Sequence, residues 1–214
     1  MVYLVQYAMK LAEGDPDKEY QIFTTHQSDE EMLKELVALF NTKLQYLEGS
    51  YHEGASLNLN WTDLDGINRM IYRKAANLPS KCRNTVTVQT SSRTHHTMAI
   101  GEDLFISQFL PRLPLSVINL GDVYLPGVEN FGKATIREKL NLIATARVHL
   151  APNSGTAHLA LLTNTHVVVY DPSNYLTGPL EHYFRKTDQI DFTYDVERAL
   201  ECVLAHCKPV ILFT

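Results

Sequence analysis

Short apolar runs alternate with amphipathic stretches along most of the chain, and this alternation predicts an α/β fold. The run VVVY at 167–170 is apolar throughout, as expected for a strand in the middle of a parallel sheet. The amphipathic stretches follow capping residues such as Ser28, Thr135 and Ser154. Further strands are predicted at 2–7, 20–25, 86–90, 115–120, 147–150, 189–193 and 210–213, and helices at 28–44, 63–75, 101–110, 136–144, 154–162 and 196–207.

The alternation becomes regular only after residue 84, and this change predicts two parts of unequal size. Residues 85–214 are typical of one Rossmann-like, doubly wound parallel sheet. Residues 1–84 are rich in loops and predict a reduced α/β segment, with the stretch 79–85 as the boundary.

Composition excludes several classes of protein. The 214 residues include 19 Lys and Arg against 24 Asp and Glu, a net charge of −5, which argues against a DNA-binding surface. Hydrophobic residues make up 45%, as in globular proteins. The three cysteines form no disulfide framework, which favours a reducing compartment. No apolar run reaches the roughly 18 residues of a membrane span, and no signal peptide is recognisable, so we expect a cytoplasmic protein.

The turn Asn-Ser-Gly-Thr at 153–156 is the strongest chemical signal, because it leads from a strand directly into a helix. Gly155 would let a ligand approach the backbone, and the N–H groups that open the helix favour an anion. Ser154 and Thr156 could add hydroxyl donors, and His158 lies on the same helical face as Ser154. A plain helix cap followed by a core histidine is the alternative interpretation.

Residues 137–174 resemble the nucleotide-sugar-binding half of GT-B glycosyltransferases of the heptosyltransferase-like family. The resemblance rests on the core Ser-Gly-x-x-His-Leu-Ala, which is complete at 154–160. It extends less specifically to 85–94, at the position of the family's first C-terminal strand and phosphate loop, and to 115–122, at its second strand. Asn153 replaces the family's usual Asp, and Arg93 stands in for a Lys that is not evident.

The resemblance implies a GT-B C-terminal lobe that transfers a sugar from a nucleotide-diphosphate sugar to an unknown acceptor hydroxyl without a metal or another cofactor. Asp15 would be the general base, with Glu13 and His26 as alternatives. The N-terminal lobe, at 1–84, would be heavily reduced, completed by a second copy of the chain, or absent with its role taken by a partner. His158 would assist catalysis by stabilising charge on the leaving phosphate, and the donor would contact Ser91, Ser92, Arg93, Asp122, Asn153, Ser154, Gly155, Thr156 and His158.

Two other functions stay open at this point. Asp63 and Asp65 form a D-x-D pair, which holds a divalent metal in GT-A glycosyltransferases, although a helix cap explains the same residues. A non-catalytic nucleotide-sugar-binding module is the second alternative. His95 and His96 are adjacent on a predicted loop, and a solvated pair explains them better than a metal site.

Overall fold

The computed structural model describes residues 21–22, 30–40, 45–46, 74–75, 77–79, 84–91, 100–171 and 188–207. The chain divides into two compact units, Met1–Asn77 and Leu78–Thr214. This division lies a few residues before the predicted boundary at 79–85. None of the helices in the described ranges combines the length and the apolar character that crossing a membrane requires.

A helix lies between two short parallel strands in the N-terminal unit. Strand β1 (Gln21–Ile22) pairs with β2 (Gln45–Tyr46), and helix α2 (Glu30–Ala38) lies between them in the chain. Leu33 and Leu36 are buried, in agreement with the helical spacing of the sequence. The helix ends well before residue 44, the predicted end, and β2 is a strand that the pattern of apolar residues did not predict.

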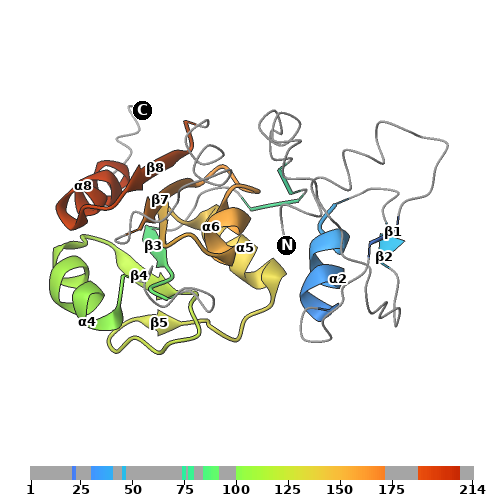
Figure 1. Ribbon diagram of the computed structural model, residues 1–214, viewed down its shortest axis with the longest axis horizontal. Helices are drawn as coiled ribbons and strands as arrows, with labels where there is room; N and C mark the ends of the chain where they lie inside the picture. The colour runs from blue at the N-terminus through green and yellow to red at the C-terminus, as the bar shows by residue number, and fades with distance from the viewer. Residues whose placement is uncertain are drawn as a thin grey trace. The chain divides into compact units, whose positions relative to one another are not determined.

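The C-terminal unit is built on a six-stranded sheet in which all neighbouring strands are parallel (Figure 1). Parallel strands need crossover connections, and the sheet confirms the predicted α/β class. In chain order, its strands are β3 (Thr85–Val88), β4 (Ser116–Asn119), β5 (Glu129–Asn130), β6 (Val148–Ala151), β7 (His166–Tyr170) and β8 (Ile190–Thr193).

The strand order across this sheet is β5-β4-β3-β6-β7-β8. Counted within the sheet, this is the order 3-2-1-4-5-6 of Rossmann-like folds. From β3, the strands β4 and β5 follow in one direction across the sheet, and β6, β7 and β8 follow in the other. The direction therefore reverses between β3 and β6, and doubly wound sheets bind their ligands beside the carboxyl ends of the strands at such a reversal.

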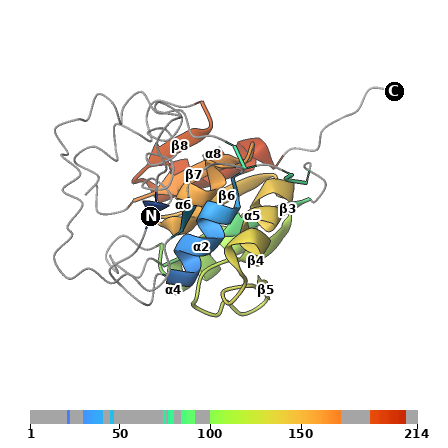
Figure 2. The same cartoon turned by 90° about the vertical axis from the view of Figure 1, so that its right-hand side faces the viewer.

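Helices cover both faces of the sheet. Figure 1 shows α4 (Glu102–Leu104) and α8 (Val196–His206) on one side, and α5 (Ile136–Thr145) and α6 (Gly155–Ala160) on the other. Figure 2 views the sheet from the side of α5 and α6. A single apolar cluster joins the sheet to α8 and to the turns after α4, and it includes Val86, Val88, Val148, Leu150, Phe105, Phe109, Ala199 and Val203.

Successive residues of a strand point to opposite faces. Because Val86 and Val88 of β3 pack in the cluster on the α8 side, Thr87 faces α5 and α6. The same alternation in β6 places His149 on the α5 and α6 side. Two polar side chains thus lie under α6, inside strands that are otherwise apolar.

The segment 101–110, predicted as one α-helix, is α-helical only in its first turn. After α4, a π-helical turn (Phe105–Phe109) and a 3-10 turn (Leu110–Arg112) follow. The Ser107 hydroxyl donates to the Asp103 carbonyl at 2.7 Å, a bond that competes with regular helical bonding. Pro111 lacks an N–H group, so it cannot extend a regular helix beyond this point.

Candidate functional site at the carboxyl edge of the sheet

The reversal between β3 and β6 brings together a polar network from three elements. Thr87 of β3 lies directly opposite His149 of β6 in the paired strands. Gln89 follows β3, and its N–H group donates to the Leu150 carbonyl at 2.9 Å. Thr156 lies in the first turn of α6. These side chains join the end of β3, the interior of β6 and the start of α6.

His149 is at the centre of this network and has no exposed surface. Its Nδ1 atom is 3.1 Å from Thr87 Oγ1, and its Nε2 atom is 3.0 Å from Thr156 Oγ1. The Thr156 hydroxyl donates to Gln89 Oε1, and Gln89 Nε2 donates to the Ser91 carbonyl. The imidazole therefore links the sheet to the helix.

The donors in this series of hydrogen bonds define one tautomer of His149. Thr156 has a single hydroxyl proton and donates it to Gln89, so it accepts from His149 at the Nε2 end. Nε2 then holds the ring proton, and Nδ1 accepts from the Thr87 hydroxyl at 3.1 Å, a shorter contact than the 3.5 Å between that hydroxyl and the Val148 carbonyl. Burial lowers the pKa of His149 to about 3, so the ring is neutral at physiological pH.

The loop that opens α6 presents its backbone outward and its hydroxyl groups inward. Ser154 is the N-cap residue, yet its hydroxyl makes no capping bond and donates to Gln89 Oε1 at 3.1 Å. Ser154 and Thr156 are only 7% and 6% exposed. Gly155 is exposed, and a Cβ atom added there would meet nothing within 4 Å. The two hydroxyls therefore hold the loop, and the open surface lies at Gly155.

His158 and Asn153 lie beside this loop. Both side chains are half-buried. Burial lowers the pKa of His158 to about 4, which leaves a neutral imidazole at physiological pH. A neutral imidazole can still donate a hydrogen bond, but it adds no positive charge to the site.

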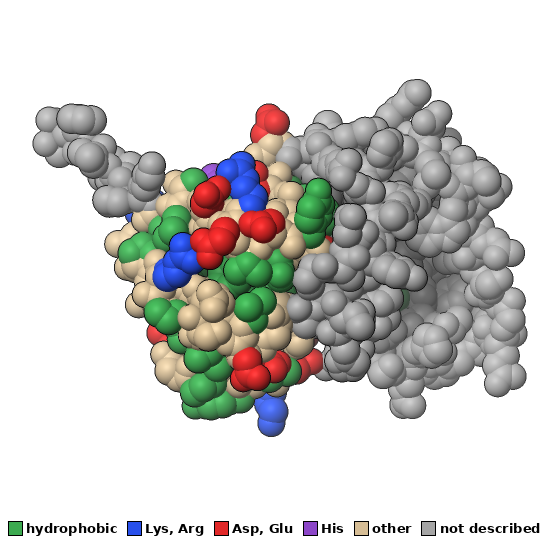
Figure 3. Space-filling view, turned by 60° about the vertical axis from the view of Figure 1, so that its left-hand side comes forward, with side chains coloured by type: hydrophobic (Ala, Val, Ile, Leu, Met, Phe, Trp, Pro, Cys, Tyr) green, Lys and Arg blue, Asp and Glu red, His purple; other side chains and the backbone are tan. Residues whose placement is uncertain are grey.

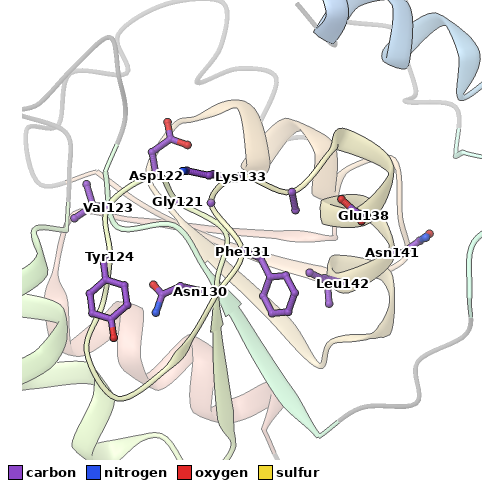
Figure 4. Close-up of a pocket in the computed structure, with 12 residues that line it drawn as sticks. Gly121, Asp122, Val123, Tyr124, Asn130, Phe131, Lys133, Glu138, Asn141 and Leu142 are labelled. Carbon is purple, nitrogen blue, oxygen red and sulfur yellow. The ribbon is translucent and has the colours of Figure 1, made fainter.

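A pocket of about 710 Å³ lies along the same edge, formed by the loops that follow β4 and β5 and by the start of α5 (Figure 4). Phe131 and Leu142 give it apolar surface. Asp122 and Lys133 come from the two loops and add one charge of each sign. The lining residues are Gly121, Asp122, Val123, Tyr124, Asn130, Phe131, Gly132, Lys133, Ala134, Glu138, Asn141 and Leu142.

Two asparagines at strand ends hold the pocket loops in shape. Asn119 is completely buried, and its Nδ2 atom donates to the Val123 carbonyl at 2.6 Å and to Asn130 Oδ1 at 2.8 Å. Its Oδ1 atom accepts from the Gly121 N–H at 2.9 Å. Asn130 in turn donates to the carbonyl of Leu125 at 2.9 Å and accepts from the Leu125 N–H at 2.9 Å. The loop between β4 and β5 is thus bonded internally.

Close backbone packing joins the pocket to the network. A Cβ atom added at Gly132 would collide with the Gly121 carbonyl oxygen, so only glycine fits where the two pocket loops meet. A Cβ atom added at Gly121 would lie 3.3 Å from Gln89 Cγ. Gly121 therefore lies against both the pocket and Gln89, so the pocket and the polar network are neighbours.

Helix α5 forms one wall of the pocket and begins with a capping box. The Thr135 hydroxyl accepts from the Glu138 N–H at 3.2 Å, and Glu138 Oε2 accepts from the Thr135 N–H at 2.8 Å. The Thr135 N–H, together with the Thr135 hydroxyl that donates to the same Oε2 atom at 3.0 Å, lowers the pKa of Glu138. The sequence pattern predicts this cap correctly, and Glu138 reaches the pocket from it.

The structure places part of the predicted site in one region. Ser91, Asp122, Asn153, Ser154, Gly155, Thr156 and His158 all follow the carboxyl ends of β3, β4 or β6. The predicted residues Asp15, Glu13, His26, Ser92, Arg93, Asp63, Asp65, His95 and His96 lie outside the described residues.

Sequence reasoning missed Gln89, His149 and Asn119. A usable signal exists for His149, because a histidine inside the buried run VHLA must find hydrogen-bond partners. Gln89 and Asn119 each follow or end a strand, which is where polar side chains of parallel sheets meet. Their partners depend on the strand order, which the sequence pattern does not determine.

The outer surface on the α4 and α8 side carries both signs of charge. Figure 3 shows acidic and basic side chains interspersed there. Two pairs account for part of this pattern, Arg112 with Glu197 at 2.7 Å and Arg198 with Glu201 at 3.0 Å. On the described part of this face, no single-sign basic patch suited to a polyanion is present.

Comparison of the chain with protein families, with curated proteins and with solved structures finds no match in any of the three. The fold and the site geometry are therefore the basis for a functional assignment.

Proposed function

We propose that the protein is a GT-B-type glycosyltransferase whose C-terminal unit binds the nucleoside diphosphate of a nucleotide sugar. The observation that supports this most directly is that a pocket and an exposed glycine loop are neighbours at the carboxyl edge of the sheet. A pocket after β4 and β5 adjoins an exposed glycine loop after β6 through Gly121 and Gln89. Doubly wound sheets bind nucleotides in this position, with the phosphates at the loop that opens a helix.

The pocket suits the nucleoside. Asp122 follows the second strand of the sheet, where an acidic residue of a Rossmann-like fold accepts hydrogen bonds from ribose hydroxyls. Phe131 and Leu142 offer apolar surface to a base, and Lys133 adds a positive charge at the rim near Asp122. We therefore assign the base and ribose to this pocket.

The glycine loop suits the diphosphate. Gly155 is exposed and has free space over its Cα atom, so phosphate oxygens can reach the backbone there. Ser154 and Thr156 fix the loop through Gln89 and His149 and leave the contact to the backbone. This role replaces the direct hydroxyl contacts expected from the sequence.

In the proposed reaction, the bond between the anomeric carbon and the diphosphate oxygen breaks, and the acceptor hydroxyl oxygen bonds to that carbon. The diphosphate leaves with the electron pair, and a base takes the hydroxyl proton. His158 is neutral and would stabilise the leaving group by a hydrogen bond only. Positive charge would come from Lys133 or from Arg93, and the base from Asp15 in the N-terminal unit.

Binding of ribonucleotides and deoxyribonucleotides tests the nucleoside assignment. The full chain would be titrated calorimetrically with UDP, GDP, ADP, CDP and dTDP, and then with the 2′-deoxy form of the best ribonucleotide. If Asp122 accepts from the ribose, Asp122→Asn weakens ribonucleotide binding about tenfold, since hydrogen bonds to charged groups contribute about 1.5–3 kcal/mol. The same substitution leaves binding of the 2′-deoxy form almost unchanged.

Asp103→Asn is the matched control, because Asp103 is an exposed carboxylate on α4, on the other face of the sheet. Failure of every nucleotide to bind at millimolar concentration would rule out the proposed function. Binding of the nucleotide sugar with neither transfer nor donor hydrolysis would indicate the non-catalytic module. Activity that requires Mn²⁺ and is lost in Asp65→Asn would indicate the GT-A type.

A further inference from the structure

A cluster of two histidines and one aspartate lies at the amino edge of the sheet, away from the nucleotide site. His166 is the first residue of β7, Asp191 is near the start of the adjacent strand β8, and His206 is the last residue of α8. Helix α8 runs back after β8, so its end returns to the edge where β7 and β8 begin. Two neighbouring strands and the helix that follows them thus bring these side chains together.

The three side chains bring one possible ligand atom each into a small volume. His166 Nε2 is 2.9 Å from Asp191 Oδ2, and His206 Nε2 is 4.0 Å from the same oxygen. One donor atom from each of the three residues lies within 4.8 Å of the other two. The imidazole rings of His166 and His206 are stacked with centroids 3.7 Å apart and an angle of 19° between them.

These separations match the geometry of a first-row divalent metal. Bonds of about 2.0–2.1 Å in a tetrahedral zinc site place neighbouring ligand atoms about 3.3 Å apart. The two measured separations from Asp191 Oδ2 lie on either side of this value. A metal lies in the plane of each imidazole that binds it, so one of the two stacked rings has to turn out of the stack, and rotation about the side-chain torsions of the partly exposed His206 can supply this turn.

The two histidines lie at different distances from Asp191. One imidazole can donate to Asp191 at 2.9 Å, but the separation of 4.0 Å from His206 is too long for a hydrogen bond. With one ring turned out of the stack, a cation would use a nitrogen of each imidazole and the carboxylate. Access is sufficient, since the side chains of His206 and Asp191 are 36% and 39% exposed, whereas that of His166 is 14% exposed.

We propose that His166, Asp191 and His206 bind one Zn²⁺ ion or a similar first-row divalent ion. Two imidazoles and a carboxylate favour Zn²⁺ over Mg²⁺ or Ca²⁺, which prefer oxygen ligands. The three protein ligands leave a fourth position for water. The ion would tie the end of α8 to β7 and β8, so its effect is on the stability of this corner of the fold. The site is independent of the proposed function.

Zinc titration of the full chain tests the site. After treatment with EDTA and removal of the chelator, the protein would be titrated with ZnCl₂ in a calorimeter, alongside Asp191→Asn and His206→Ala. Other histidines of the chain could also bind zinc, so the informative quantity is the difference between proteins. We expect each variant to lose one equivalent of bound zinc, or to bind that equivalent at least about 10–100-fold more weakly. This is the loss of metal affinity seen even when a residue that only hydrogen-bonds to a metal ligand is removed.

Glu201→Gln is the matched control, because it removes an exposed carboxylate from the same helix, on which Glu201 pairs with Arg198. It should bind zinc like the wild type. Saturating ZnCl₂ should raise the melting temperature of the wild type and of Glu201→Gln, but not that of His206→Ala. MgCl₂ at the same concentration should have no such effect.

His206→Ala keeps the test valid if Asp191→Asn folds poorly, because His206 is partly exposed at the end of its helix. Circular dichroism in the absence of metal checks that each variant is folded. Equal zinc stoichiometry and affinity in the wild type and in folded His206→Ala would overturn the proposal. A melting temperature that zinc raises equally in both proteins would also overturn it.

Discussion

Acidification should destabilise the C-terminal unit through His149. This imidazole is completely buried, and burial lowers its pKa from 6.5 to about 3 in the folded protein. In the unfolded chain the ring takes up a proton near its ordinary pKa, while in the folded chain it stays neutral. The unfolded state therefore binds more protons between these two values, and the free energy of unfolding falls as the pH falls through this window.

The size of the effect follows from the two pKa values. Each unit of difference corresponds to 1.36 kcal/mol once the pH is below both values. At about pH 5 the unfolded ring is almost fully protonated and the folded ring is not, so His149 lowers the free energy of unfolding by about 2 kcal/mol relative to about pH 7.5. A loss of this size is a large part of the stability of an ordinary domain.

The comparison of wild type with His149→Gln isolates this contribution. Glutamine can donate to Thr156 as the Nε2–H group of His149 does, but it does not titrate. Urea unfolding followed by circular dichroism at both pH values would give the free energy of unfolding of each protein. Carboxylates and other histidines titrate in both proteins, so their contributions cancel in the difference.

We expect the stability of wild type minus that of His149→Gln to fall by about 2 kcal/mol from pH 7.5 to pH 5. A difference that stays constant over this range would refute the reasoning, since it would mean that His149 titrates alike in both states. Nuclear magnetic resonance offers a direct check, because the ring should carry its proton on Nε2 and should not titrate above about pH 4.

Three substitutions around the site give further predictions. Asn119→Asp places a carboxylate oxygen where Nδ2 of Asn119 donates to Val123 and Asn130. It should lower the midpoint of urea unfolding by the equivalent of about 2–4 kcal/mol. An unchanged midpoint would contradict the assigned hydrogen bonds. Gly132→Ala forces the pocket loops apart and should weaken nucleotide binding in calorimetry. Gly127→Ala is its control: the added Cβ atom would meet nothing within 4 Å, but the backbone φ is positive, so this change should lower stability and leave affinity intact. His158→Ala should weaken binding of the nucleotide sugar while the melting temperature changes little; a large loss of stability with full affinity would assign His158 to the core instead.

Most elements of the C-terminal sheet follow from local patterns. The runs at β3, β4, β6 and β7 are apolar enough to predict buried strands, and the capping box at Thr135 defines the start of α5. β5 was missed because Glu129 and Asn130 form a strand of two residues with no apolar signal. What makes it a strand is pairing with β4 and the bonds of Asn130, which are tertiary contacts.

The predicted turn into a helix is present, whereas the predicted binding roles of its residues stay predictions. The Asn-Ser-Gly-Thr turn does open a helix at the reversal, as the sequence indicates. The direction of the Ser154 and Thr156 hydroxyls depends on Gln89 and His149, which are distant in the chain. Local spacing contains no information about such partners, because they come from the pairing of β3 with β6.

The internally bonded loop between β4 and β5 has a consequence for binding kinetics. Asn119 and Asn130 satisfy the backbone groups of this loop before any ligand arrives. A preorganised loop loses little conformational entropy when a ligand binds, so more of the contact energy appears as affinity. If the pocket binds nucleotides as proposed, association should be fast and similar for related nucleotides, and selection among bases should come from how long each one stays bound.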